Sequence, residues 1–209
     1  IDDPEYDIDA VLWVGEGGTS TTLGIGKILS GEVNPSGKLT DTYYKKHCYN
    51  PICANFGSYD NLGPVVSSAN GGKSNRYVVY QEGIYSGYRY TETRYEDIVL
   101  NTPNAGSFSY DDVVSYPFGF GLSYSTFDYS DMNVSYNEFD DSYHVSIKVT
   151  NTGSVKGKES VQIYAQQPYT QYDIDNHIEK SAVDFVGYGK TKMLNPGDSE
   201  TLSITVDGR

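Results

Sequence analysis

Hydrophobic residues form a short unbroken run, DAVLWVG, at residues 9–15. Such a run is typical of a strand that is buried on both faces, as in a parallel sheet. A glycine-rich loop follows, and apolar residues then recur at helical spacing between residues 23 and 29. Hydroxyl side chains at residues 19–22 can cap the start of this helix, and Gly31 can end it. The pattern predicts a strand, a loop and a helix, whose exposed N–H groups suit an anion or a hydroxyl-rich ligand.

The next part of the chain is less regular. The tetrapeptide NPSG at residues 34–37 has strong turn chemistry and precedes a short predicted edge strand that ends by Lys46. Residues 47–76 contain many Gly, Asn and Ser residues without a clear period, which predicts a long ordered loop. The tyrosine-rich residues 77–95 favour β-structure, and residues 101–112 are again interpreted as a loop.

Strict alternation of apolar and polar residues marks the second half. In YHVSIKVTNTG, residues 143–153, Val and Ile alternate with Ser, Lys and Thr, which indicates a half-buried strand. Similar patterns occur near residues 127–136, in residues 158–168 and in residues 182–207, the last holding two strands joined by the turn NPGD. Five or more short strands without a helix predict a small β-sandwich.

The stretch YPFGFGLSY, residues 116–124, lies between these two halves and contains four aromatic residues, one proline and two glycines. Such a stretch suits either an aromatic platform for a ligand or a crossover between two folded units. Its position favours the crossover, with its aromatic rings filling the seam. The predicted organisation is one unit at residues 1–115, a linker at 116–124 and a second unit at 125–209.

Composition and charge exclude several classes of function. The 209 residues carry 28 Asp and Glu against 15 Lys and Arg, a formal charge of −13 that would repel a nucleic acid. The P-loop pattern fails because Ile28 follows Gly26 and Lys27, and the dinucleotide pattern G-x-G-x-x-G fails at Ser20. No apolar run approaches the roughly 18 residues that span a membrane. The acidic opening IDDPEYDID is not a signal peptide, so cytoplasmic and secreted locations both stay open.

Cys48 and Cys53 are the two cysteines of the chain. They can remain thiols or form a local disulfide, and the sequence leaves both alternatives open. With only His47 nearby they supply too few ligands for tetrahedral zinc, so no metal site is predicted.

Five blocks of the sequence together resemble the later part of glycoside hydrolase family 3, which includes β-glucosidases and β-xylosidases. In order, they are VLWVGEGG with GIGKILSGEVNPSGKLTDTYYKK, QEGIYSGYRY, YPFGFGLSYSTFDYS, VTNTGSVKGKESVQIYAQQP, and VGYGKTKMLNPGDSETLSITV. The resemblance implies that residues 1–115 are the last part of an α/β-sandwich domain, a mostly parallel sheet with helices. It implies that residues 125–209 are an immunoglobulin-like, fibronectin type III-like β-sandwich.

The resemblance has departures as well as matches. The family commonly has Gly-x-Pro-Gly after the buried strand, whereas this chain has a glycine, Gly17, in place of the proline. The long segments 47–76 and 101–112 resemble a bacterial subgroup in which this region precedes the catalytic barrel. The resemblance implies a β-glucoside or oligosaccharide substrate, a (β/α)8 barrel domain in the same enzyme, and no cofactor.

Retaining glycosidases need two carboxyl groups about 5–5.5 Å apart. In the family the nucleophilic Asp belongs to the barrel, and the acid/base lies upstream of the strand that matches VLWVG. Neither motif has a counterpart here, so no catalytic residue is assigned to this chain. Glu82, Arg89 and Arg94 are interpreted as structural, the two arginines pairing with carboxylates inside the fold.

Three residues are candidate substrate contacts. Glu16 follows the predicted buried strand and can reach a substrate rim, or it can simply stabilise a helix N-terminus. Tyr169 and Tyr172 can stack on a sugar or a partner domain, or they can belong to a solvated loop.

Three hypotheses for the function follow. The chain is the non-barrel part of a β-glycosidase, a carbohydrate-binding β-sandwich module without catalysis, or a domain that mediates interaction, including a homodimer. The sequence does not distinguish glucose from xylose, because the two sugars differ by one CH2OH group.

Overall fold

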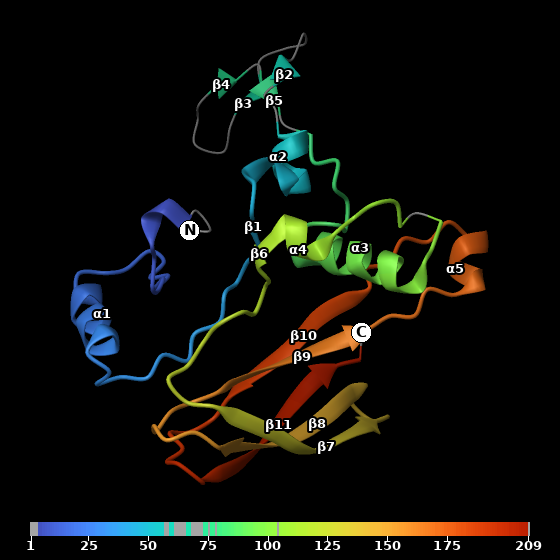
Figure 1. Ribbon diagram of the computed structural model, residues 1–209. Helices are drawn as coiled ribbons and strands as arrows, with labels where there is room; N and C mark the ends of the chain where they lie inside the picture. Colours follow the sequence, from blue (N-terminus) through green and yellow to red (C-terminus); the bar gives the residue numbers. More distant parts are fainter. Residues whose placement is uncertain are drawn as a thin grey trace.

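The computed structural model describes residues 4–56, 59–60, 66–67, 73–74, 76–77, 79–103 and 105–208. Helices and small sheets form the upper part of the molecule in Figure 1, and two larger sheets form the lower part. This combination of sheets with helices is consistent with an α/β arrangement.

The helix predicted after the glycine-rich loop is confirmed as α1, Thr21–Leu29. Ser20 occupies its N-cap position, although its side chain makes no capping hydrogen bond. Gly31 ends the helix with a φ of +76°, a left-handed conformation that glycine adopts without strain. A short 3-10 helix, η1 (Pro4–Tyr6), precedes this region.

The strand predicted at residues 9–15 is wrong for this structure, because the segment is irregular and its side chains are exposed. A strand buried on both faces needs neighbouring strands that accept its hydrogen bonds and cover its side chains. No strand in the described part of the chain pairs with this segment. All pairings between described strands are antiparallel, so the expected mostly parallel sheet is not found among them.

The predicted edge strand is confirmed as β1 (Tyr43–Tyr44), which pairs with β6 (Val114–Tyr116). The predicted loop at residues 47–76 contains regular structure in its described parts, and the rest of that prediction lies outside the described residues. These short elements are η2 (His47–Tyr49), α2 (Pro51–Asn55), β2 (Tyr59–Asp60), β3 (Val66–Ser67), β4 (Lys73–Ser74) and β5 (Arg76–Tyr77).

The β-structure predicted for residues 77–95 is wrong over most of its described length, because residues 79–87 are irregular and a helix, α3 (Tyr88–Leu100), begins after them. Tyrosine favours strands, but Tyr88 and Tyr95 are seven positions apart, which places these two side chains on one face of a helix. Asn101 ends α3 in the left-handed conformation, with a φ of 52°. The loop that follows carries one short helix, α4 (Tyr110–Val113).

Five strands of the second half are confirmed, and they form two antiparallel sheets with the orders β11–β8–β7 and β10–β9. They are β7 (Phe127–Asn137), β8 (Ser142–Asn151), β9 (Ser160–Gln166), β10 (Val183–Lys190) and β11 (Ser199–Asp207). The expectation that this half has no helix is wrong, because α5 (Gln171–Asp175) lies between β9 and β10.

The hydrophobic core lies between the two lower sheets. Ile147 and Val149 of β8 are buried, as the alternation predicted, and they cluster with Val161 of β9 and with Leu194. Leu202 packs against this cluster from β11. Burying one such aliphatic side chain contributes about 1.5–3 kcal/mol, so this cluster stabilises the pairing of the two sheets.

The crossover at residues 116–124 packs in the seam between the upper and lower parts. Leu39 donates a backbone hydrogen bond to Phe120 (2.7 Å), and Gly119 donates one to Leu39 (2.8 Å). The ring of Phe118 contacts the rings of Tyr88 and Phe185, at centroid distances of 4.7 and 5.4 Å. The prediction that aromatic rings fill the seam is therefore confirmed for Phe118.

The other end of the crossover does not fill the seam. Leu122 and Tyr124 are exposed, although the Tyr124 hydroxyl donates a hydrogen bond to the carbonyl of Ile28 in α1 (2.9 Å). The seam prediction is therefore wrong for Tyr124, because its ring turns outward while its hydroxyl contacts the helix.

Candidate functional site

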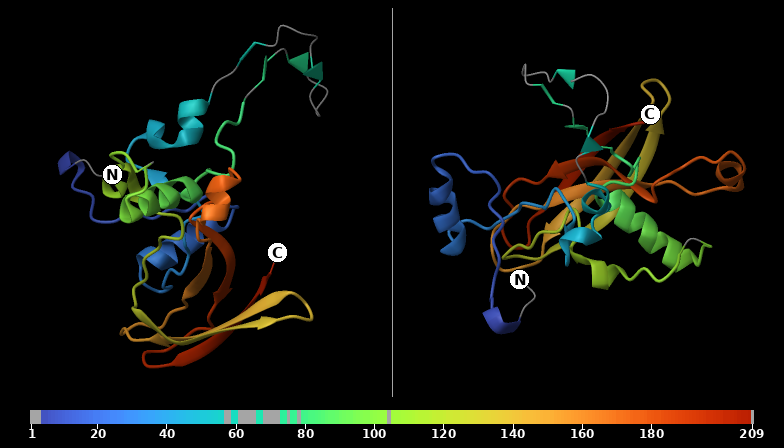
Figure 2. Two further views of the ribbon diagram at one scale, coloured as in Figure 1. Left: turned by 90° about the vertical axis from the view of Figure 1, so that its right-hand side faces the viewer. Right: turned by 90° about the horizontal axis from the view of Figure 1, so that it is seen from above.

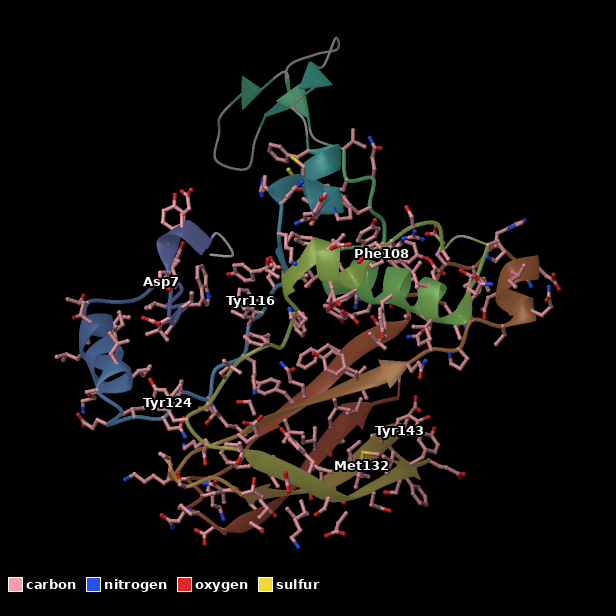
Figure 3. All side chains as sticks on the ribbon, viewed as in Figure 1. Asp7, Phe108, Tyr116, Tyr124, Met132 and Tyr143 are labelled. Carbon is pink, nitrogen blue, oxygen red and sulfur yellow. The ribbon has the colours of Figure 1, made fainter. Side chains whose placement is uncertain are left out.

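A cavity of about 890 Å³ opens between α3, the segment before α4, the crossover and the sheet of β9 and β10. We call it the aromatic hollow, because seven of its lining residues carry aromatic rings. Its lining consists of Tyr88, Glu92, Tyr95, Ile98, Phe108, Ser109, Tyr110, Asp111, Pro117, Phe118, Gly119, Phe120, Gln162, Tyr164 and Val183. Phe108 is labelled beside α3 in Figure 3.

Helix α3 presents Tyr88, Glu92 and Tyr95 to the aromatic hollow. These residues are spaced by four and three positions, which places them on one face of a helix. The Tyr88 hydroxyl accepts a hydrogen bond from the backbone N–H of Phe185 in β10 (2.8 Å). Next to it, Nε of Arg89 donates to Oδ1 of Asp184 (2.6 Å), so α3 is fixed to β10 at this end.

Ring contacts form the walls of the hollow. Tyr164 of β9 lies edge-on to Phe118, at a centroid distance of 6.4 Å, and edge-on to Tyr88, at 6.3 Å. Tyr95 and Tyr110, which also line the hollow, meet edge to face at 5.5 Å. Such pairs contribute about 0.5–1.5 kcal/mol each beyond the area that they bury, so they hold the walls in place.

Glu92 is a partly buried carboxyl group of this lining. Its Oε1 accepts a hydrogen bond of 2.6 Å from the hydroxyl of Tyr110. Burial raises the pKa of Glu92 above its usual value, while the hydrogen bond from Tyr110 opposes that rise. Burial and then the neighbouring Glu92 raise the pKa of Tyr110, which keeps this phenol protonated as the donor.

Tyr164 and Gln162 add polar atoms from β9. The Tyr164 hydroxyl donates a hydrogen bond to Oε1 of Gln162 (3.1 Å). Burial first, and then Tyr88 and Glu92, raise the pKa of Tyr164, so its hydroxyl is neutral. Aromatic walls with a few converging acceptors and donors are typical of sites that bind small organic ligands.

The structure does not bring the predicted site residues together. Glu16 is exposed on the loop before α1, whereas Tyr169 and Tyr172 are exposed at and beside α5. Helices α1 and α5 lie on opposite sides of the molecule in Figure 1 and in the right-hand view of Figure 2. None of the three residues lines the aromatic hollow.

The interpretation of residues 77–95 as β-structure hides the helical face that Tyr88, Glu92 and Tyr95 present to the hollow. The recurrence of Tyr88, Glu92 and Tyr95 at helical spacing, with Asn101 as a helix terminator, was the signal that could have identified this face. No sequence pattern indicates that β9 would meet it, because the contact joins segments about seventy residues apart, as in the hydrogen bond from Gln166 to Glu96.

The structural roles predicted for the arginines are confirmed. Arg89 pairs with Asp184, and Nη1 of Arg94 contacts Oδ2 of Asp97 (3.0 Å). The carbonyl of Glu82 accepts a hydrogen bond from the N–H of Tyr85 (3.0 Å), which forms a turn before α3.

Cys48 and Cys53 are free thiols in this structure, with their sulfur atoms 3.6 Å apart. Among the described residues, no three His, Cys, Asp or Glu side chains gather closely enough to hold a metal ion. None of the helices in the described ranges is sufficiently long and apolar to cross a membrane.

Comparison with known proteins agrees with the resemblance seen in the sequence. Residues 2–88 match the family model of the glycosyl hydrolase family 3 C-terminal domain. This chain thus contains part of a glycosyl hydrolase family 3 C-terminal domain. It is 32% identical over 204 residues to thermostable beta-glucosidase B of Acetivibrio thermocellus, a match that covers 97% of this chain and 22% of that protein.

Two further relatives show the same relation. Beta-glucosidase A of Butyrivibrio fibrisolvens is 34% identical over 212 residues, covering 95% of this chain and 21% of that protein. The structure of beta-glucosidase 3B from Thermotoga neapolitana in complex with alpha-D-glucose superimposes with a TM-score of 0.65 at 31% identity, covering 90% of this chain and 21% of that one. The chain thus spans about a fifth of the length of these relatives.

Proposed function

We propose that this chain is the non-barrel segment of a family 3 β-glucosidase, which hydrolyses terminal β-D-glucosyl residues by a retaining mechanism. Both catalytic carboxylates lie outside this segment, and a (β/α)8 barrel of the same enzyme supplies the rest of the active site. The observation that carries the proposal is the match of 97% of the chain to only 22% of a protein named as a β-glucosidase.

The domain organisation is part of the same proposal. Residues 1–115 are the latter part of an α/β-sandwich domain, residues 116–124 the crossover, and residues 125–209 a fibronectin type III-like β-sandwich. Two antiparallel sheets with a shared core at Val149 and Val161 support the last assignment. In the enzyme, this segment shapes a wall beside the barrel and holds the domains together through the seam at Phe118.

Glu16, Tyr169 and Tyr172 are proposed as substrate contacts. Their exposure supports this role, since each side chain is open to a molecule or domain that approaches it. Because Glu16 lies far from the two tyrosines, they act as separate contacts with a β-glucoside or an oligosaccharide rather than as one site. A homodimer that covers Tyr169 and Tyr172 is compatible with the same exposure.

An activity assay tests the proposed function. The 209-residue chain and the complete protein encoded by its gene are each incubated with an aryl β-glucoside. We expect turnover by the complete protein and none by the 209-residue chain, because the two carboxyl groups of a retaining glycosidase must come from elsewhere. Robust turnover by the 209-residue chain alone would contradict the proposal, and so would an inactive complete protein.

The alternative function is a carbohydrate-binding or domain-interaction module without catalysis. The observation that favours it is the aromatic hollow, which has the walls of a binding site on this chain itself. The same assay separates the two functions, because a pure binding module leaves the complete protein unable to hydrolyse the aryl β-glucoside.

A further inference from the structure

The aromatic hollow has the size and shape of a site for a small molecule. Its volume of about 890 Å³ lies within the range of roughly 300–1,000 Å³ that is common for ligand pockets. Its walls come from α3, the crossover and β9. The Tyr88–Phe185 hydrogen bond and the Arg89–Asp184 ion pair fix α3 to β10, the strand that pairs with β9, and the ring of Phe118 in the crossover contacts Tyr88 and Tyr164. A ligand therefore meets a formed surface rather than one that it must assemble.

The rings of the hollow leave surface open for stacking. Tyr95 is 50% exposed although Tyr110 contacts one side of it, and Tyr164 is also exposed. The face of an aromatic ring is electron-rich, so it attracts the positively polarised C–H groups on the flat side of a pyranose. A sugar ring thus fits these walls better than a purely linear ligand.

The polar atoms of the hollow suit the hydroxyl groups of the same ligand. The Glu92 carboxylate accepts hydrogen bonds, and the partly buried site strengthens them. Gln162 adds an amide, and the Tyr164 hydroxyl lies beside it. These groups lie on α3 and β9, so they approach a ligand between the two elements from different directions.

The charge of the lining selects against anions. Glu92 and Asp111 are acidic, and none of the described lining residues is Lys or Arg. A phosphate or a sugar acid would face uncompensated repulsion in a partly buried site, whereas a neutral saccharide would not.

We propose that the aromatic hollow is a binding site for a neutral saccharide, in which Tyr95 and Tyr164 stack on a pyranose ring and Glu92 accepts hydrogen bonds from its hydroxyl groups. The ligand is either a free monosaccharide or the end of an oligosaccharide. This proposal does not rest on the proposed enzymatic activity, which another part of the protein performs.

Calorimetric titration of the 209-residue chain tests the site. Glucose and cellobiose are the two neutral ligands, and glucuronic acid is the charged counterpart of glucose. We expect the neutral sugars to bind and glucuronic acid not to bind. Tighter binding of cellobiose than of glucose would assign the site to the end of an oligosaccharide, and equal binding would assign it to a monosaccharide.

Substitutions locate the binding in the hollow. Tyr95→Ala removes a stacking face worth about 0.5–1.5 kcal/mol, so binding weakens up to about tenfold. Glu92→Gln keeps the shape but replaces a charged acceptor by a neutral one, and binding weakens roughly fivefold. Tyr95→Phe retains the ring and retains most of the affinity.

Tyr136→Ala in β7 is the matched control, because Tyr136 is also 50% exposed and does not line the hollow. It leaves the affinity unchanged, and circular dichroism spectra confirm that each variant keeps its fold. The proposal is overturned if neither neutral sugar binds, if glucuronic acid binds as tightly as glucose, or if Tyr95→Ala binds like the wild type. None of these results determines the outcome of the aryl β-glucoside assay. The saccharide site and the proposed β-glucosidase function can therefore be contradicted independently of each other.

Discussion

The ring of Phe118 contacts both the upper and the lower part of the molecule. It contacts Tyr88 of α3, Tyr164 of β9 and Phe185 of β10, and it is partly buried among them. Phe118→Ala removes these contacts and leaves a void, which destabilises the fold by about 2–3 kcal/mol. We expect the melting temperature to fall by roughly 5–10 °C.

Phe139→Ala is the control at the same scale, because that ring is 102% exposed at the tip of the hairpin between β7 and β8. We expect the Phe139→Ala variant to keep the melting temperature of the wild type. An unchanged melting curve for Phe118→Ala would show that the seam does not depend on this ring.

Individual elements show where sequence reasoning succeeds and where it ends. Strand β8 was predicted correctly because Val145, Ile147 and Val149 alternate with polar residues, and one buried face suffices for that pattern. The strand predicted at residues 9–15 is wrong, because an apolar run indicates that a segment is buried but not which element buries it. The aromatic hollow was unpredictable as a whole, since it joins α3 to β9 through contacts that no local pattern encodes.

Helix α5 is short, and a buried ion pair stabilises it. Asp173 is 2% exposed, contacts Nζ of Lys180 (2.8 Å) and closes a capping box with Thr170. The hydrogen bond from Lys180, followed by those from Thr170, lowers the Asp173 pKa from 3.8 to about 2. Because the folded-state pKa is lowered, the stabilisation is complete above pH 3.8 and is lost as the pH falls through about 2.

We therefore expect Asp173→Asn to lower the melting temperature at pH 7, and the difference from the wild type to narrow as the pH falls from 3.8 to about 2. Asp175→Asn is the control, because Asp175 is exposed on the same helix. A difference for Asp173→Asn that stays constant across this pH range would contradict the role of its charge.

The thiols of Cys48 in η2 and Cys53 in α2 lie close enough for an oxidant to join them in a disulfide. Oxidised glutathione accepts two electrons and two protons from Cys48 and Cys53, which yields one intramolecular disulfide and two molecules of glutathione. We expect thiol labelling to detect two reactive groups before this treatment and none after it. In a Cys48→Ser variant the remaining thiol of Cys53 has no partner in its own chain, so it forms a mixed disulfide with glutathione. Wild-type chains that become cross-linked to each other on oxidation would contradict the local pairing.

At the scale of the whole molecule, the side chains of residues 9–15 are exposed to solvent, although their composition is that of an interior strand. Trp13, the one tryptophan of the chain, is 64% exposed. If the chain is the segment of a longer enzyme that we propose, strands outside it cover this run on both faces. Trp13 is thus a reporter of whether the 209 residues are part of a larger fold.

In the 209-residue chain we expect Trp13 fluorescence to have the emission of an exposed indole and to be quenched by acrylamide. In the complete protein, the difference in fluorescence between the wild type and a Trp13→Phe variant isolates the same side chain. We expect that difference to be shifted to shorter wavelength and shielded from acrylamide, because an interior strand removes the indole from water. Equal quenching in both would mean that the run stays outside the sheet, and the assignment of residues 1–115 to an α/β-sandwich domain would then be wrong.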